Sequence, residues 1–534
     1  MRGRVGAAVV LAGLAHAAAL AWPFELALGA WLRPGEPVAG LQGASLLVLV
    51  ALLARAQTAF AAAVRAGGFA LAWLAGTFWW LFVSMHVYGG LAAPLAVAAV
   101  LALAAFLALD YALAAAVWWR WGHAGVAARV GAFAALWTLA EMARGVLWTG
   151  FPWGAGGYAQ IEALGWLAPW VGVYGMGAAS AALAAALVLG GAVLRAGAGV
   201  LALALWVVPT TGPGLVAALP DATQAAGPLP VRLLQGAIAQ DQKFDTEAGV
   251  PLALRWYGQA IVHASADPKL AGGLVVAPET AIPLLPQDID ADYWHALAGA
   301  VRAGRVAVLL GVPLGSFTDG YTNSVVGWQP GEPATDAGLD PFAALSRYRY
   351  DKHHLVPFGE FIPRGFRWFT DLMHIPLGDF DRGALPQPPF AWAGQRIAPN
   401  ICYEDLFGEE LAAGFRGPAS APTVLVNVSN IAWFGDTVAI DQHRHISRLR
   451  ALELGRPMVR ATNTGATAVI DHRGRLVAEL PRGQRGVLDA TVEARTGITP
   501  YAAWAARWGL WPLVAACVTV LALGWMRRPR RGAP

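Results

Sequence analysis

Residues 395–404 read QRIAPNICYE, an apolar run typical of a buried strand that ends at a thiol followed by polar side chains. Two other stretches share this design: GLVVAPE at 273–279, which ends at Glu279, and RYDKHHLVPF at 349–358, which contains Lys352. A sharp turn after the first run would expose the thiol. A thiol acts as a nucleophile only where a base or a positive charge favours the thiolate. We therefore predict a site in which a carboxylate, an ammonium and a thiol act together in acyl transfer.

Each of these side chains also has an ordinary structural explanation. Cys402 alone would more often be an inert buried thiol, but the Tyr-Glu-Asp sequence after it and its two partners favour a nucleophile. Glu279 follows an apolar run, so it is either a paired structural ion or a carboxylate whose raised pKa suits a general base. Lys352 lies in a charged run, where lysines are usually solvated. The apolar residues after it favour an inward position that stabilises an oxyanion.

The segment around these runs is predicted to form an α/β domain. Runs of strand length alternate with segments of helical periodicity, and a turn at Asp471–Gly474 predicts a hairpin within 467–480. This alternation predicts an α/β sandwich with mixed sheets. The predicted strands are 231–238, 273–279, 305–312, 323–328, 395–404, 423–430 and 457–465, the predicted helices are 245–264, 292–302 and 437–455, and the predicted loops are 329–345 and 376–394.

The first 212 residues differ in composition from the rest of the chain. They contain only 14 charged side chains, separated by long runs of Ala, Leu, Val and Trp. A helix needs roughly 20 apolar residues to cross a bilayer. Glu141 and Arg144 lie three residues apart in one such run, and we expect them to pair inside the bundle. About eight spans are predicted, near 5–22, 38–54, 67–88, 91–118, 125–147, 164–187, 192–211 and 508–526.

Positive charges orient the predicted spans. Seven spans would deliver residues 213–500 to the outer face of a bacterial inner membrane, the periplasmic side, and the eighth would return the chain. The predicted domains are a membrane domain at 1–212, a linker at 213–230, a catalytic domain at 231–495, and a last span with a basic cytoplasmic tail at 496–534. The arginines that fall on alternate, cytoplasmic connections are Arg2, Arg4, Arg55, Arg65, Arg120, Arg129, Arg195 and the final cluster.

The composition argues against several other kinds of protein. Cytoplasmic arginines explain the net charge of +4, so no nucleic acid partner is needed. Cys517 lies within a predicted span, so a disulfide with Cys402 is not expected. The spacing of His443 and His445 resembles a metal pair, but no convincing third ligand accompanies it. We therefore expect neither a metal nor a cofactor.

These runs and several longer motifs resemble known families. Glutamate, lysine and cysteine in this order resemble the carbon–nitrogen hydrolase (nitrilase) superfamily, whose fold is an αββα sandwich. Over nearly its whole length the chain resembles one membrane branch, the apolipoprotein N-acyltransferases, which have seven spans before this domain and one after it. The motifs that carry the resemblance are GFPWGAGGY (150–158), APETAIP (277–283), KHHLVPFGEFIP (352–363), ICYEDLFGE (401–409), NVSNIAWFGD (427–436), ALELGRPMVRATNTGATAVID (451–471) and TGITPYA (496–502).

The resemblance assigns roles to individual residues. It implies that Glu279 takes the proton of Cys402 and that Lys352 helps to hold the developing oxyanion, with the Tyr403 backbone N–H as a second donor. Glu360 matches a second glutamate that the family needs near its site. Further residues that the resemblance places beside the nucleophile or the substrate pocket are Glu404, Phe244, Asn427, Ser429, Trp433, Phe434, Arg460 and Asn463.

The chain departs from the family pattern at three positions. Ile431 stands where the family usually has Asp, and Phe244 stands where it often has Trp. Ala277 replaces a residue that is commonly larger. None of the three belongs to the triad, so we expect these departures to bear on substrate preference rather than on activity.

The resemblance implies a two-step transfer that needs no cofactor. A fatty acyl chain would pass from a membrane phospholipid to the Cys402 thiol as a thioester. It would then pass to the α-amine of the S-diacylglyceryl cysteine of an apolipoprotein. We expect the protein to be a monomer. Two alternatives are a membrane-anchored amidase or nitrilase that uses water as the acceptor, and a transporter or lipoprotein-binding scaffold with a relict domain.

Overall fold

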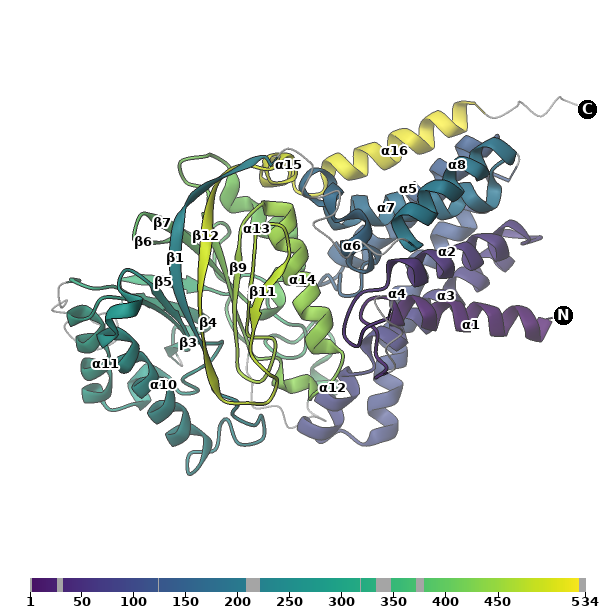
Figure 1. Ribbon diagram of the computed structural model, residues 1–534. Coiled ribbons are helices and arrows are strands. Elements are labelled where there is room, and N and C mark those ends of the chain that lie inside the picture. The colour runs from purple at the N-terminus through teal and green to yellow at the C-terminus, as the bar shows by residue number, and fades with distance from the viewer. Residues whose placement is uncertain are drawn as a thin grey trace, which may run out of the picture. The chain divides into compact units, whose positions relative to one another are not determined.

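The chain divides into two compact units (Figure 1). The first comprises Met1–Phe82, Ala92–Pro220 and Trp508–Pro534, and the second comprises Val83–Leu91 and Asp221–Arg507. The computed structural model describes residues 2–25, 32–122, 124–207, 221–316, 318–332, 347–370 and 379–527.

The first unit is helical. Among the described residues, four helical segments are long and apolar enough to cross a membrane, or five if the bent pair Pro500–Trp508 and Trp511–Met526 is one span. Three further apolar helices are shorter, so the count of eight spans is not confirmed. The α-helices are α1 (Arg2–Ala18), α2 (Ala39–Ala54), α3 (Ala59–Phe78), α4 (Ala93–Trp119), α5 (Val126–Val146), α6 (Ile161–Leu164), α7 (Ala168–Leu189), α8 (Ala192–Ala202) and α16 (Trp511–Met526).

The third predicted span is wrong in its position. We expected it at 67–88, but α3 begins at Ala59 because the Thr58 side chain accepts a hydrogen bond from the Ala61 N–H and caps the helix. Residues Val83–Tyr88 form a separate π-helical turn that belongs to the second unit. Hydropathy alone cannot detect a cap, so the apolar run was placed too late in the chain.

Glu141 and Arg144 of α5 bind a loop, whereas the sequence predicted a pair between them. Glu141 Oε1 accepts from the Gly156 N–H at 2.8 Å. Arg144 Nη1 donates to the carbonyl oxygens of Phe151 at 2.6 Å and Trp153 at 2.8 Å. Non-helical backbone inside a membrane unit needs partners within the protein, and these two side chains supply them.

The second unit is built on two six-stranded sheets. Their orders are β12-β1-β2-β3-β4-β5 and β11-β10-β9-β8-β7-β6. Strands β1 to β3 and β7 to β9 run parallel to their neighbours within each set, and the remaining pairs are antiparallel, so both sheets are mixed as predicted. The strands are β1 (Thr223–Gln235), β2 (Leu274–Val276), β3 (Ala307–Ser316), β4 (Gly320–Trp328), β5 (Tyr348–Asp351), β6 (Phe390–Trp392), β7 (Gln395–Ile401), β8 (Val424–Ser429), β9 (Met458–Thr462), β10 (Ala468–Ile470), β11 (Leu476–Glu479) and β12 (Gly486–Gly497).

The two sheets share one apolar core and are covered by helices outside. Val276 and Leu309 of the first sheet lie in the same buried cluster as Val426 and Val459 of the second. Helices α10 (Gly249–Ala266) and α11 (Ala291–Ala303) pack on the outer side of the first sheet (Figure 1). Helices α13 (Gly408–Ala412), α14 (Ala439–Leu454) and α15 (Pro500–Trp508) contribute to the cluster that includes residues of the second sheet. The layers are therefore those of an αββα sandwich.

The start of the sandwich differs from the prediction. Strand β1 begins at Thr223, so residues 223–230 are not linker. They pair with β12, which the sequence analysis missed, and a register shift between Ala225 and Pro228 accommodates the proline. Residues 390–392 of a predicted loop form β6, which pairs with β7. Most of the other predicted loop, residues 333–345, lies outside the described residues.

Candidate functional site

The three predicted reactive groups lie at strand ends. Glu279 is in the turn after β2, Lys352 directly follows β5, and Cys402 directly follows β7. Lys352 Nζ lies 3.3 Å from Glu279 Oε1, and the Cys402 thiol interacts electrostatically with both groups. Glu279 and Lys352 are buried, while Cys402 is half-buried. The structure thus brings the carboxylate, the ammonium and the thiol together.

The backbone at Cys402 makes the sharp turn that the sequence predicted. Its φ is 52°, in the left-handed region that residues other than glycine adopt at a cost of about 1–3 kcal/mol. A 3₁₀-helix, Cys402–Leu406, starts there. The Cys402 carbonyl accepts hydrogen bonds from Asn427 Nδ2 and His443 Nε2, each at 3.2 Å. These bonds hold the strained conformation.

Glu279 is poised as an ionised carboxylate. Burial disfavours its charge, but Lys352, the Asn323 amide, Lys243 and the Asn430 N–H outweigh burial and hold the pKa of Glu279 below its usual value. Asn323 Nδ2 donates to Oε1 at 2.7 Å, and the Asn430 N–H donates to Oε2 at 2.8 Å. The raised pKa that we considered for Glu279 is therefore wrong, because the sequence does not show these donors.

The resting thiol is protonated. Burial, and then the negative charge of Glu279, raise the pKa of Cys402 to about 12. Lys352 and the Ser429 side chain lower the pKa by less. Burial also disfavours the charge of Lys352, but Glu279 and Glu360 outweigh it and raise the pKa of the ammonium. A neutral thiol beside an ionised carboxylate is the arrangement that a general base needs.

Glu360 joins the same centre. Its Oε1 accepts from Lys352 Nζ at 2.9 Å and from Asn323 Nδ2 at 2.7 Å, and its Oε2 accepts from the Val356 N–H at 2.8 Å. It is buried, so the second glutamate of the motif lies at the site as the resemblance implies. Asn323, which bridges both glutamates, was not predicted because it stands 44 residues from Glu279 in the chain.

Glu404 joins the turn at Cys402, here called the nucleophile turn, to β5 with Lys352 after it, here called the lysine strand. One carboxylate oxygen accepts from the Ile401 N–H at 2.6 Å and the Tyr350 hydroxyl at 2.9 Å. The other accepts from the backbone N–H groups of His353 at 2.7 Å and His354 at 3.2 Å. Glu404 therefore fixes the residues beside Cys402 and Lys352 relative to each other. The Tyr403 ring is buried against His354 and Phe407.

A second buried network lies beneath the nucleophile turn. Arg460 Nη2 lies 3.1 Å from His443 Nδ1, and an arginine only donates, so Nδ1 is the acceptor and the proton is on Nε2. That Nε2 donates to Asp405 Oδ1 at 3.0 Å as well as to the Cys402 carbonyl. Arg460 and Asp405 are fully buried and form an ion pair at 3.3 Å. Of the two histidines whose spacing resembles a metal pair, His443 supports this turn.

Four asparagines link the remaining motif residues. Asn427 Nδ2 also donates to Asn400 Oδ1 at 2.7 Å. Asn463 accepts from the Ile238 N–H at 3.1 Å and donates to its carbonyl at 2.8 Å, and it also donates to Asn430 Oδ1 at 3.2 Å. Asn427 and Asn463 therefore hold backbone at the site.

Lys243 is a charged residue of the site that the sequence analysis missed. Its side chain is 2% exposed, and its Nζ donates to the Glu279 carbonyl oxygen at 3.2 Å. The neighbouring Phe244 was singled out and is 38% exposed. Only the position beside Phe244 could have indicated Lys243, because its contact with Glu279 spans 36 residues.

The aromatic residues of the NVSNIAWFGD motif lie in the 3₁₀-helix Ile431–Phe434. Trp433 and Phe434 are partly exposed, and the Trp433 ring meets the Tyr88 ring edge-on at 5.9 Å. Ile431 is 1% exposed, so the apolar residue that replaces the usual aspartate lies in the core.

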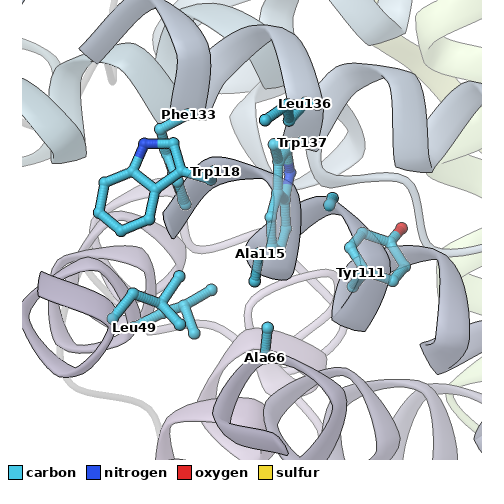
Figure 2. Close-up of a pocket in the computed structure, with 10 residues that line it drawn as sticks. Leu49, Ala66, Tyr111, Ala115, Trp118, Phe133, Leu136 and Trp137 are labelled. Atoms are coloured by element: carbon cyan, nitrogen blue, oxygen red, sulfur yellow. The ribbon is translucent and has the colours of Figure 1, made fainter. Parts of the chain in front are cut away.

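A separate apolar pocket lies in the helical unit between α2, α3, α4 and α5 (Figure 2). It contains none of the predicted site residues. The pocket is lined by Leu49, Leu53, Ala66, Tyr111, Ala114, Ala115, Trp118, Phe133, Leu136 and Trp137.

In the part of the chain that the structure describes, no group of three or more His, Cys, Asp or Glu side chains is placed to hold a metal ion.

A glutamate, a lysine and a cysteine at the strand ends of an αββα sandwich define the carbon–nitrogen hydrolase class. The family model described as carbon-nitrogen hydrolase matches residues 231–501. A second model, described as the apolipoprotein N-acyltransferase N-terminal domain, matches residues 15–186. A crystal structure of a carbon–nitrogen hydrolase from Helicobacter pylori G27 is 15% identical with a TM-score of 0.34, over 57% of this chain and 95% of that chain.

Two curated relatives extend the match to the membrane unit. An apolipoprotein N-acyltransferase of Verminephrobacter eiseniae is 53% identical over 521 residues, 94% of this chain and 92% of the relative. One from Ralstonia nicotianae is 45% identical over 512 residues, 92% of this chain and 90% of the relative. The chain belongs to the apolipoprotein N-acyltransferase family and is an acyltransferase, and the amidase alternative is not favoured.

Proposed function

We propose that the chain moves a fatty acyl group from a membrane phospholipid to the N-terminal amine of an S-diacylglyceryl apolipoprotein, through a thioester on Cys402. One observation carries the proposal: the Cys402 thiol lies at the centre where the Glu279 carboxylate pairs with the buried Lys352 ammonium at 3.3 Å. This arrangement suits nucleophilic acyl transfer. The relatives are apolipoprotein N-acyltransferases, which supplies the acceptor class.

In the first step Glu279 takes the proton of Cys402 as sulfur attacks the ester carbonyl carbon. The negative charge that develops on the carbonyl oxygen is stabilised by Lys352 and the Tyr403 backbone N–H. When the carbon–oxygen bond breaks, Glu279 returns the proton to the departing oxygen. A lysophospholipid leaves and the acyl chain stays on sulfur.

In the second step the acceptor α-amine attacks the thioester carbonyl. Glu279 takes a proton from the attacking nitrogen, the carbon–sulfur bond breaks, and the proton passes to sulfur to restore the thiol. A thioester reacts with an amine without ATP, so no cofactor is required. We assign Phe244, Trp433 and Phe434 to contacts with the lipid chains because they are exposed or partly exposed aromatic side chains.

The remaining assigned residues hold the site rather than the substrate. Glu360 positions Lys352, and Glu404, Asn427 and Arg460 support the nucleophile turn. Ser429 interacts with the thiol, and Asn463 fixes the segment after β1. We propose a monomer, because Glu279, Lys352 and Glu360 pair with one another within a single chain.

We also propose that eight helical segments cross a bacterial inner membrane, with the N-terminus inside and the sandwich domain in the periplasm. Arg55 follows α2, Arg120 follows α4, and Arg527 follows α16, so basic residues recur on alternate connections. Reporters fused near Ala225 and at Arg195 test this. The first is expected to be active only outside the cytoplasm, and the second only inside.

Mass spectrometry of the intact protein incubated with phospholipid tests the reaction. The expected result is one acyl adduct on Cys402, sensitive to hydroxylamine and absent from Cys402→Ala. Adding a diacylglyceryl lipopeptide should discharge the adduct to an N-acyl product. Release of free fatty acid at the same rate with and without lipopeptide would favour water as the acceptor, and an adduct on Cys402→Ala would overturn the proposal.

A further inference from the structure

Lys243 is a buried lysine close to the acyl-transfer centre. It lies in the segment after β1 and is 2% exposed. Its Nζ donates a hydrogen bond to the Glu279 carbonyl oxygen at 3.2 Å. Burying an ammonium is costly unless opposite charge compensates it, so this position calls for a partner. The charges that face Lys243 are the Glu279 carboxylate and the Cys402 sulfur when ionised.

The segment that carries Lys243 is tied to the same residues that hold Glu279. The Ile238 N–H donates to Asn463 Oδ1, and Asn463 Nδ2 donates to the Ile238 carbonyl oxygen, so the orientation of the Asn463 amide is fixed. Asn463 Nδ2 therefore also donates to Asn430 Oδ1. Asn430 Nδ2 then faces Gln240 Oε1 at 2.9 Å, while the Asn430 backbone N–H donates to Glu279 Oε2. A lysine on this anchored segment keeps a defined position beside Glu279.

Lys352 alone does not balance the two carboxylates that it contacts. Two carboxylates, Glu279 and Glu360, face Lys352, which carries a single positive charge. Arg460 also acts on the Cys402 sulfur, but its ion pair is with Asp405. Lys243 supplies the second positive charge beside Glu279.

We propose that Lys243 is a positioning residue of the acyl-transfer centre, which keeps Glu279 ionised and holds its backbone while Glu279 removes the proton of Cys402. The proton moves from sulfur to the Glu279 carboxylate, so the total charge of the centre does not change. The proposal rests on the role of Glu279 as the base given above.

The charge of Lys243 depends on pH in the working range. Burial lowers the pKa of Lys243 to about 8, against the raising effects of Glu279 and Cys402. Below that pH the ammonium lowers the pKa of Glu279. Above it Lys243 becomes neutral and the pKa of Glu279 rises, but Glu279 is already ionised at that pH. The support from Lys243 should therefore appear on the acid limb of acyl-enzyme formation, where Glu279 titrates and Lys243 is charged.

A single-turnover assay with labelled phospholipid, read as acyl-enzyme and lysophospholipid from pH 3 to 8, tests the proposal without the acceptor amine. For the wild type the acid limb should follow the titration of Glu279. Lys243→Arg should keep that limb because arginine stays charged. In Lys243→Met the acid limb should move up by about one pH unit, the shift typical of losing a nearby opposite charge. The exposed Lys269→Met is the matched control and should follow the wild type.

The outcomes separate two failures. If Lys243→Met does not fold, an acid limb of Lys243→Arg that lies one pH unit above that of the wild type overturns the role of Lys243. A Lys243→Met profile equal to that of Lys269→Met, with matching unfolding temperatures, also overturns it. Acyl-enzyme formation in Cys402→Ala would instead overturn the proposed function itself.

Discussion

The Lys352 ammonium lies 2.9 Å from Glu360 Oε1, so the second glutamate contacts the lysine directly. Glu360 follows Pro357 and Gly359, residues typical of a loop. In the structure it is buried, and the Val356 N–H also binds its carboxylate. Glu360 thus helps to set the position and charge of Lys352, and it does so in the resting enzyme.

Glu360→Gln should slow acyl-enzyme formation about 10–100-fold, because it removes one charge-assisted hydrogen bond to Lys352. The thioester should still be measurable. Glu279→Gln should cost more, about 10²–10⁴-fold, because it removes the base. Single-turnover yields of thioester and lysophospholipid distinguish the two variants. Equal and complete loss in both would place Glu360 in the proton transfer itself.

Glu404→Gln should weaken the link between the nucleophile turn and the lysine strand. Glutamine brings an N–H₂ group toward Ile401, His353 or His354, whose N–H groups need an acceptor. We expect a loss of about 1–3 kcal/mol in the free energy of unfolding and slower acylation. The exposed Glu247→Gln is the control. Unchanged unfolding and acylation in Glu404→Gln would show that the link is dispensable.

His443→Phe tests the support beneath the turn. It removes the donor to the Cys402 carbonyl and the acceptor for Arg460, and leaves the Asp405 carboxylate with one partner fewer. We expect kcat to fall while KM for phospholipid changes little, because the substrate does not contact this side chain. The exposed His295→Phe should behave as wild type. A rise in KM with kcat unchanged would contradict this support role.

The sequence predicted the sandwich and its reactive groups because Glu279 and Cys402 follow apolar runs and Lys352 precedes one. Cys402 could be placed at a strand end from the run before it, whereas β5, which precedes Lys352, was not among the predicted strands. The charge state of Glu279 could not be predicted, since its donors Asn323 and Asn430 are distant in the chain. Strand β12 was missed because its pairing with β1 joins opposite ends of the domain. The start of α3 depends on the Thr58 cap, which an average of hydropathy does not detect.

The protonation state of Cys402 in the resting enzyme can be measured by alkylation of the thiol. Burial and the charge of Glu279 raise the pKa of Cys402 to about 12, so only a small fraction of thiolate exists at neutral pH. Alkylation of Cys402 by iodoacetamide, in a Cys517→Ala background, should therefore be slow at pH 7 and rise severalfold per unit up to pH 10.

Glu279→Gln should change alkylation and acylation in opposite directions. It removes the negative charge that opposes the thiolate while Lys352 remains, so the pKa of Cys402 falls and alkylation at pH 8 should be faster than in the wild type. Acyl-enzyme formation should still be about 10²–10⁴-fold slower, because glutamine cannot take the proton from sulfur and pass it to the leaving oxygen. Labelling rates at several pH values, measured by mass spectrometry, give the thiol pKa directly. A rate that does not vary with pH would mean that the thiolate is already formed and paired with Lys352, and Glu279 would then act only on the later proton transfers.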